Sequence, residues 1–205
     1  MRLAGIMLAI AALAAALAGG MRAQAGPAAG AAQLNVAGHV TVDGRPVNYL
    51  IRHLPVNAFP ELPAKVKAEL DRRGCLIPQS YEARRPENVV RGAFEKAGTQ
   101  DWAVLCSAQG TAQLLVFFAS APDKPAMLIS WPETQRLQAH DATGSLGFNW
   151  AIDRATPEQI HTAQAGMTPR PAKLDHDAVA DMVIDRKRVD HYFAKGEWSK
   201  LDVPE

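Results

Sequence analysis

The sequence predicts an α+β domain made mainly of antiparallel hairpins, with one or two helices packed on the sheet and one disulfide. Three observations carry this prediction. Apolar and polar residues alternate on both sides of several turn dipeptides, which is the pattern of β-hairpins. Residues 61–73 have the periodicity of a helix together with start and stop signals. Two cysteines, Cys75 and Cys106, lie in the part of the chain that we expect to be exported.

The N-terminal segment is typical of a secretory signal peptide. Arg2 precedes an apolar stretch without charge, residues 3–20, and Ala23 and Ala25 supply the small side chains that a signal peptidase requires. We therefore expect cleavage between Ala25 and Gly26. A retained membrane anchor is the alternative, because the apolar stretch just reaches the length that spans a bilayer.

Cleavage would divide the chain into a signal peptide (1–25), a leader rich in Gly, Ala and Pro (26–33) and one domain (34–205). The signal peptide takes two of the 22 basic residues, so 20 basic and 21 acidic residues remain and the net charge is about −1. This balance excludes general electrostatic binding to nucleic acid or to an anionic membrane surface. We expect a periplasmic or secreted protein with no nucleic-acid partner and no membrane attachment after cleavage.

The first hairpin is expected around Asp43-Gly44. Apolar residues alternate over 34–42 and again over 47–51, and the dipeptide between them suits a tight turn. Pro46 has no amide hydrogen. It therefore predicts that its strand lies at a sheet edge or pairs only after Val47.

Residues 61–73 give the strongest helix prediction. Pro63 suits the first helical position, apolar residues recur every four positions, and Gly74 suits the C-terminal stop. Glu69 is placed one turn before Arg73, where the two charges can pair.

The two cysteines predict a disulfide. Cys75 follows the expected helix in the extended run Cys-Leu-Ile-Pro, and Cys106 lies in an apolar strand. The bridge would close a loop of 31 residues, worth about 3 to 4 kcal/mol by the chain-entropy estimate. The alternative is a nucleophilic Cys106, but its Val-Leu-Cys-Ser context predicts a buried and inert thiol.

Two nearly continuous apolar runs, 101–107 and 112–119, predict central strands covered on both faces, one of them by the 61–73 helix. Further expectations are strands at 127–131 and 145–153, a short helix capped by Thr156, an irregular segment at 167–173, and a hairpin of 189–193 with 197–201. Residues 177–185 fit a helix that aligns three aspartates and also fit a strand. We prefer the strand, because no helix stop precedes Arg188.

Three patterns stand between residues 74 and 107: Gly-Cys-Leu-Ile-Pro-Gln, Asn-Val-Val-Arg-Gly-Ala-Phe and Asp-Trp-Ala-Val-Leu-Cys-Ser. In them the chain resembles a group of uncharacterised secreted bacterial proteins. That resemblance implies export and no particular activity.

Residues 88–118 are also similar in outline to one hairpin of the FG-GAP repeat. The matching positions are Gly92, Phe94, Gly98, Asp101 and Ala103-Val104. In such repeats the loop after the Phe carries several carboxylates that bind calcium, whereas this loop has only Glu95 and Asp101, too few oxygen ligands for calcium. A propeller needs several blades and one copy is visible, so the resemblance implies a single hairpin of related shape.

No side-chain pattern predicts a catalytic residue, a metal site or a cofactor. The six histidines, which lack metal-type spacing and are interpreted as exposed polar residues, are His39, His53, His140, His161, His176 and His191. Asp175-His176-Asp177 and Asp190-His191 place carboxylates beside histidines, but neighbours on a strand point to opposite faces. The basic clusters Arg84-Arg85 and Arg186-Lys187-Arg188 are interpreted as solvated surface.

The four tryptophans, Trp102, Trp131, Trp150 and Trp198, favour core packing over a carbohydrate-stacking platform, because each lies in a strand context. These features favour a binding or accessory module for a protein or envelope component over an enzyme. The alternative is an envelope hydrolase whose site is assembled from residues far apart in sequence. A pocket with converging His, carboxylate or Ser groups would favour that alternative.

Overall fold

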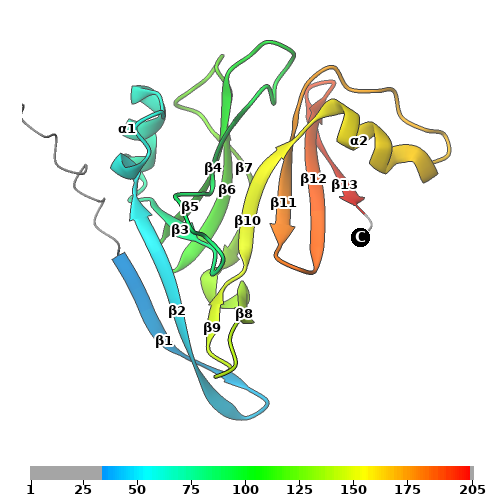
Figure 1. Cartoon of the computed structure of the whole chain (residues 1–205). Helices are drawn as coiled ribbons and strands as arrows, with labels where there is room; N and C mark the ends of the chain where they lie inside the picture. Colours follow the sequence, from blue (N-terminus) through cyan, green and yellow to red (C-terminus); the bar gives the residue numbers. More distant parts are fainter. Residues whose placement is uncertain (1–33, 204–205) are drawn as a thin grey trace, which may run out of the picture. The chain divides into compact units, whose positions relative to one another are not determined.

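Figure 1 shows a computed structural model of the chain, which describes residues 34–203. The predicted signal peptide (1–25), its cleavage site at Ala25 and Gly26, and the leader (26–33) lie outside the described residues. Within the described part, no helix is long and apolar enough to cross a membrane.

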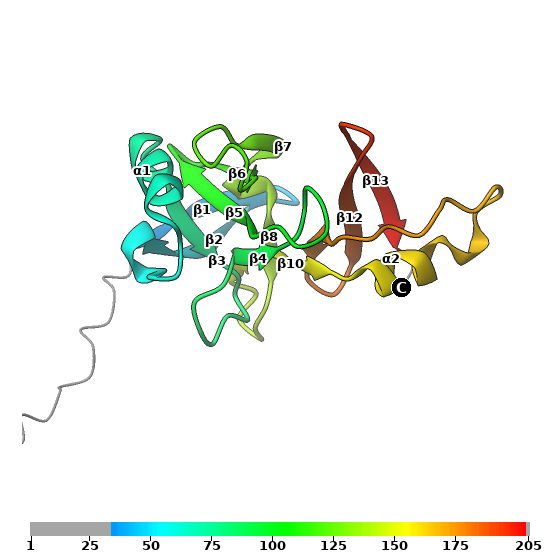
Figure 2. The ribbon, with the colours of Figure 1, turned by 90° about the horizontal axis from the view of Figure 1, so that it is seen from above.

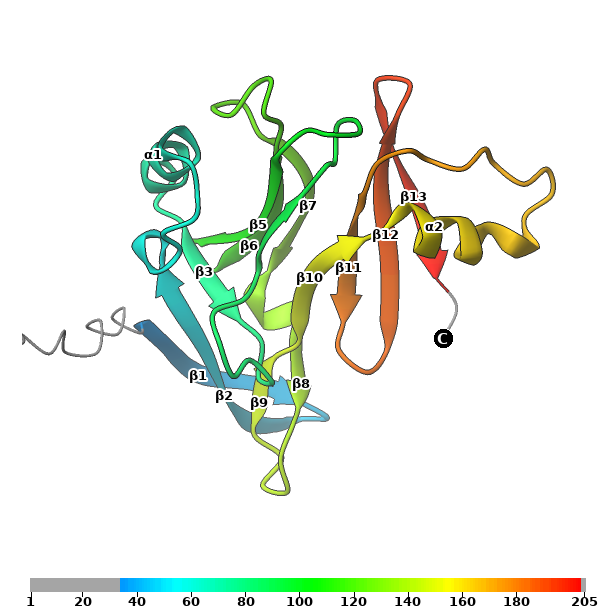
Figure 3. The same ribbon diagram turned by 45° about the horizontal axis from the view of Figure 1, so that its top comes forward.

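The α+β class is wrong: residues 34–203 are mostly β, with 49% of them in strands and 15% in helices, the 3₁₀ turns included. The two α-helices of this described part are short, α1 at Ala64–Arg72 and α2 at Pro157–Ala163. The sequence signals for helices mark these two segments correctly, but each segment is short. Elsewhere the alternation of apolar residues places nearly every segment in one of two sheets (Figures 1 and 3).

The larger sheet has the strand order β7-β6-β5-β3-β2-β9-β8, with β1 paired to β2 and β4 paired to β5. Its strands are β1 (Leu34–Val42), β2 (Arg45–Pro55), β3 (Leu76–Gln79), β4 (Val89–Gly92), β5 (Asp101–Ala108), β6 (Thr111–Phe117), β7 (Ala126–Pro132), β8 (Leu137–Ala139) and β9 (Leu146–Phe148). All pairings are antiparallel except β2 with β9.

The smaller sheet is an antiparallel meander in sequence order (Figure 1; Figure 2 gives the view from above). Its strands are β10 (Trp150–Ala155), β11 (Ala178–Val183), β12 (Lys187–Ala194) and β13 (Glu197–Val203). The 3₁₀ turns are η1 (Val56–Ala58), η2 (Glu133–Gln135) and η3 (Gln164–Gly166). The preferred strand over 177–185 is confirmed as β11.

Three hairpins follow the turn chemistry of the sequence. At Asp43-Gly44, Gln109-Gly110 and Lys195-Gly196 both turn residues have positive φ, the conformation that two-residue hairpin turns require. The expectation for Pro46 is wrong, because β2 is an inner strand and pairs from Arg45 onward. Pro46 is paired with Thr41, next to the hydrogen-bonded pair Val42 and Arg45 beside the turn. Its nitrogen therefore points away from β1, to the side of β2 on which no other strand pairs with Pro46.

The single strand expected over 145–153 is two strands in different sheets. The chain leaves the larger sheet after β9 and enters the smaller one at β10, and Asn149 lies between them. The backbone of Asn149 bonds to both sides, since its N–H donates to Arg136 O at 2.8 Å and its carbonyl accepts from Ile184 N at 3.0 Å. The buried Asn88 side chain adds a second link, because it bonds to Pro78 O of β3 and to the backbone of β10.

The disulfide is present: Cys75 and Cys106 are bonded, with 5.0 Å between their Cα atoms. It joins the end of α1 to β5, as the sequence predicted. The helix covers one face of β5 and β6 through Val66 and Leu70, and the smaller sheet covers the other face through residues such as Trp150. Pro63 is the N-cap of α1 and not its first helical residue, so the helix begins one residue later than expected.

Candidate functional site

Three of the six histidines are buried, which overturns their interpretation as exposed polar residues. His53 and His191 are each 1% exposed and His176 is 9% exposed. His53 Nε2 lies 2.6 Å from Glu133 Oε1, and His191 Nε2 lies 3.5 Å from Asp181 Oδ2. Glu133 lies 80 positions from His53, and Asp181 lies 10 positions from His191 on the neighbouring strand, so neither pair is adjacent in sequence.

The residues around His176 and His191 show when the side chains of two residues adjacent in sequence can form a hydrogen bond. On β12, Asp190 bonds to Arg188 on one face while His191 contacts β11 on the other, as strand geometry requires. Asp175 and His176 lie outside a strand, so they do bond, with 2.7 Å between Asp175 Oδ1 and His176 Nδ1. This bond holds the pKa of Asp175 below its usual range.

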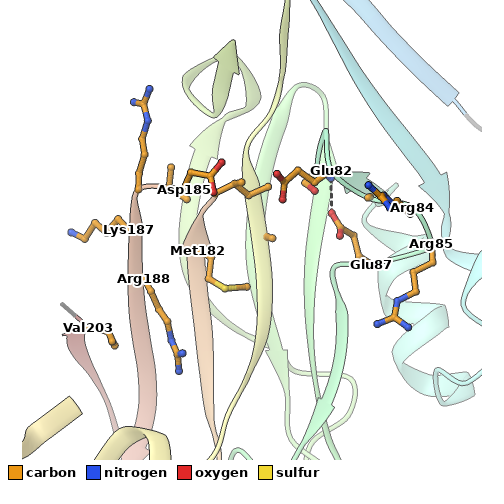
Figure 4. Close-up of a pocket in the computed structure, with 15 residues that line it drawn as sticks. Glu82, Arg84, Arg85, Glu87, Met182, Asp185, Lys187, Arg188 and Val203 are labelled. Atoms are coloured by element: carbon orange, nitrogen blue, oxygen red, sulfur yellow. Dashed lines mark hydrogen bonds between the residues drawn. The ribbon is translucent and has the colours of Figure 1, made fainter. Parts of the chain in front are cut away.

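A groove of about 1130 Å³ runs over the outer face of the smaller sheet, the face turned away from the larger one (Figure 4). We call it the outer groove. Directly paired residues share one face of a sheet, and the row Ala151, Met182, Arg188 and Val203 crosses all four strands and lines the groove. The next rows of this face are covered by α2 through Ile160.

The rim of the outer groove is rich in arginine. Arg84 and Arg85 come from the loop between β3 and β4, and Arg186 comes from the turn between β11 and β12. All three are exposed, and none forms an ion pair in the described part of the chain. The other charged lining residues are Glu82, Glu87, Asp185, Lys187 and Arg188.

The loop that carries Arg84 and Arg85 is fixed by its backbone. Arg52 Nη2 donates to the carbonyls of Ser80 and Ala83, at 2.6 and 2.9 Å. Glu87 Oε1 accepts from Ser80 N at 2.7 Å, so this carboxylate is engaged within the loop. The two arginines are therefore presented on an ordered backbone while their side chains stay unpaired.

Arg188 is the fixed cation of the groove floor. Its Nε and Nη2 donate to the two oxygens of Asp190, at 2.8 and 3.1 Å, and Asp190 is fully buried. A two-pronged bond of this kind holds the guanidinium in one orientation. Arg188 thus has a fixed orientation, whereas the three rim arginines are exposed and unpaired.

A second cavity of about 760 Å³ lies between β7 with η2 and the inner face of the smaller sheet. We call it the inter-sheet cleft. The lining side chains that carry polar or aromatic groups are Ser130, Trp131, Gln135, Arg136, Asp181, Lys187, His191, Lys200 and Asp202. Ser130, His191 and Asp181 are of the types on which the hydrolase alternative depends, but the paired row Cys106, Gln113 and Ser130 places the Ser130 side chain on the α1 face of the larger sheet.

Arg136 and Asp181 organise the cleft. Asp181 Oδ1 accepts from Trp150 Nε1 at 2.6 Å. The Arg136 guanidinium carbon lies 4.4 Å from the ring centroid of Trp150 and 5.5 Å from that of Trp131. Burial lowers the pKa of Arg136, and the nearby Asp181 carboxylate opposes this shift.

The tryptophans do not share one environment. Trp102 and Trp150 are core residues, as expected, and Trp198 is partly buried against Phe118, with ring centroids 5.8 Å apart. Trp131 is different, because 44% of its surface is exposed. The expectation of core packing fails for it because β7 is an edge strand.

Asp101, the carboxylate at the end of the FG-GAP-like loop, is used by the protein itself. Its Oδ2 accepts from Glu95 N and from Thr99 Oγ1, and its Oδ1 accepts from Ala119 N. Hydrogen bonds thus close this loop. Across residues 34–203, no group of three or more His, Cys, Asp or Glu side chains is placed to hold a metal ion.

Comparison of the chain with models of known families, with curated proteins and with solved structures gives no match. The resemblance to secreted bacterial proteins stays a prediction, and any proposal of function rests on the two cavities.

Sequence reasoning missed both cavities. The two basic clusters were visible but were interpreted as solvated surface, and nothing in the sequence shows that Arg84 and Arg186 border one groove. Of the two pairs of adjacent arginines in residues 34–203, Arg72-Arg73 forms ion pairs with Glu69 and Arg84-Arg85 forms none, a difference that the sequence does not show.

Proposed function

We propose that the protein is a secreted or periplasmic binding module that holds an acidic, extended segment of an envelope protein in its outer groove. The observation that carries this proposal is the set of three unpaired arginines, Arg84, Arg85 and Arg186, above a floor on which apolar side chains surround Arg188. Export is supported by the signal-like segment 1–25 and by the disulfide.

The groove suits a peptide that carries both acidic and apolar side chains. Met182 and Val203 on the floor offer apolar surface, and the rim arginines offer charge-assisted bonds to carboxylates. An extended segment places alternate residues on opposite sides, so acidic residues can meet the rim while apolar residues meet the floor. Charge on the rim accelerates encounter with an acidic partner and selects against basic ones.

A peptide-binding titration tests this proposal. The probe is a labelled peptide of alternating Glu and Val, added to mature protein that begins at Gly26, and the measurement is fluorescence anisotropy. We expect Arg84→Ala/Arg85→Ala/Arg186→Ala to weaken binding by about tenfold or more, because each lost charge-assisted contact costs about 1 kcal/mol or more.

The matched control removes three charges elsewhere. Arg45, Arg91 and Lys124 are exposed and lie outside the groove, so Arg45→Ala/Arg91→Ala/Lys124→Ala should keep the affinity. Equal weakening by both triple variants would show general attraction and overturn the proposal. So would equal binding of a peptide of alternating Lys and Val.

An envelope hydrolase is the second candidate, and the inter-sheet cleft is the observation that favours it. Ser130, His191 and Asp181 all line this cavity. The Ser130 hydroxyl makes no hydrogen bond to His191 within residues 34–203, and His191 is 1% exposed, so the nucleophile and base are not assembled in this conformation. A screen of ester and amide substrates that finds turnover abolished by Ser130→Ala and by His191→Gln would favour the hydrolase.

A further inference from the structure

Trp131 is the most exposed of the tryptophans and projects into the inter-sheet cleft. The Arg136 guanidinium lies near its ring, and Arg136 is itself held near Trp150. The indole is therefore braced in place, although almost half of it faces solvent. A rigid aromatic face costs little conformational entropy when a ligand stacks on it.

The cleft around this indole is polar. The rows of the inner face place Asp181 beside Val189 and Asp202, and His191 beside Lys200. Because paired residues share a face, the side chains of Asp202 and Lys200 project toward the cleft along with Asp181. Gln135 adds an amide group from η2. An apolar plane ringed by hydrogen-bonding groups suits a sugar ring, which has C–H faces and hydroxyl edges.

The charged side chains that line the cleft include one lysine, Lys200, that forms no ion pair among the described residues. Lys187 pairs with Asp202 at 3.1 Å. Asp181 accepts from Trp150 and lies beside His191 and Arg136. Lys200 is exposed and has no ion pair among the described residues, so its ammonium is free to meet an anionic group of a ligand.

From this arrangement we propose that the inter-sheet cleft is a second binding site, for a saccharide that carries a carboxylate. The sugar ring stacks on Trp131, its carboxylate meets Lys200, and its hydroxyls bond to Gln135. This site lies on the opposite face of the smaller sheet from the outer groove and is independent of the proposed peptide binding.

Calorimetric titration with a trimer of galacturonate tests the proposal. The same trimer with its carboxylates methyl-esterified is the matched ligand control, because it keeps the rings and removes the charge. We expect Trp131→Ala to weaken binding by about tenfold or more and Trp131→Phe to restore part of it, since loss of a stacked aromatic costs about 1 kcal/mol or more. Lys200→Gln should reduce binding of the charged trimer to the level of the ester.

Met127→Ala is the protein control. Met127 is 56% exposed on the same edge strand and lies outside the cleft, so its removal should leave the saccharide affinity unchanged. Thermal unfolding checks that every variant is folded at the temperature of the titration. The groove variant Arg84→Ala/Arg85→Ala/Arg186→Ala should also keep saccharide binding, which separates this proposal from the previous one.

Several outcomes would overturn the proposal. A folded Trp131→Ala variant that binds as tightly as the unaltered protein would remove the stacking site. Equal loss in Met127→Ala would show a general effect of the edge strand. Equal binding of inorganic tripolyphosphate, with the same dependence on Lys200, would show an anion site without sugar recognition.

Discussion

Helices of similar length cover the two sheets, but the apolar cores beneath the two helices differ in size. Under α1, twelve buried residues include Leu70, Trp102, Phe117 and both cysteines. Under α2 there are five, and three of them are alanines. Both cavities of the candidate sites are lined by the smaller sheet.

This contrast separates stability from binding. Free energy of burial scales with apolar area, so the large side chains and the disulfide under α1 contribute most to folding. The smaller sheet buries less apolar area under its helix. One row of its outer face contains Arg188 and the next row contains Asp190. Its polar side chains line both cavities.

The largest effect that would test this contrast is removal of the disulfide. Cys75→Ser/Cys106→Ser should lower the free energy of unfolding by about 3 to 4 kcal/mol, because the unfolded chain regains a loop of 31 residues. Urea unfolding followed by tryptophan fluorescence measures this change. Below the lowered midpoint, peptide binding in the outer groove should persist.

The controls for this variant use a reductant. Unaltered protein should lose a similar free energy of unfolding on reduction, whereas the double serine variant should not respond. Two reactive thiols in denatured but unreduced protein would contradict the bridge.

A smaller loss of stability with a larger effect on binding is expected on the other sheet. Ile160 is the fully buried residue of α2, and Ile160→Ala should cost about 2 to 3 kcal/mol by leaving a cavity under the helix. Because α2 covers the rows beside the groove floor, peptide affinity should fall as well. Parallel measurements of urea unfolding and peptide affinity check both parts. Unchanged affinity would show that the groove does not depend on this core.

Sequence patterns predicted the local structure well where a turn or cap carries its own signal. Asp43-Gly44 and Lys195-Gly196 turn two hairpins, and Gly74 ends α1, because a glycine stands at a position of positive φ in each of these segments. The split at Asn149 could not be predicted in the same way. Alternation shows which residues face a core but not which of two sheets the strand joins.

The candidate sites depend on contacts between distant residues, which patterns do not show. His53 and Glu133 are separated by 80 positions, and their pairing follows from the register of β2 and the place of η2. Arg84 and Arg186 share a groove only because the loop after β3 reaches the outer face of the smaller sheet. The exposure of Trp131 depends on β7 being an edge strand, a property of the whole sheet.

The N-terminus of α2 offers a milder test of the weaker region. Thr156 accepts from Gln159 N, and Gln159 Oε1 accepts from Thr156 N, which makes a capping box. Thr156→Ala should lower the free energy of unfolding by about 1 kcal/mol. Thr162→Ala, an exposed change within the same helix, should have no such cost. Similar losses in both variants would contradict a specific role of the cap.

The smallest expected effect concerns Glu69, on the helix of the stable region. Hydrogen bonds from Arg72, opposed by burial and helped by Arg73, lower its pKa from 4.5 to about 2. A carboxyl whose pKa is lower in the folded state adds stability above its unfolded pKa and loses it as pH falls from about 4.5 toward 2.

Glu69→Gln should therefore be less stable than the unaltered protein at neutral pH, and the difference should shrink as pH falls through this range. Arg72 is 68% exposed, so solvent screens the pair and keeps the effect small. Urea unfolding of both proteins from pH 7 to about pH 3 measures it. Glu61→Gln is the control, because Glu61 is exposed and forms no ion pair in the described chain. A difference that stays constant with pH would mean that the substitution acts through packing of the buried Glu69 side chain and not through its charge.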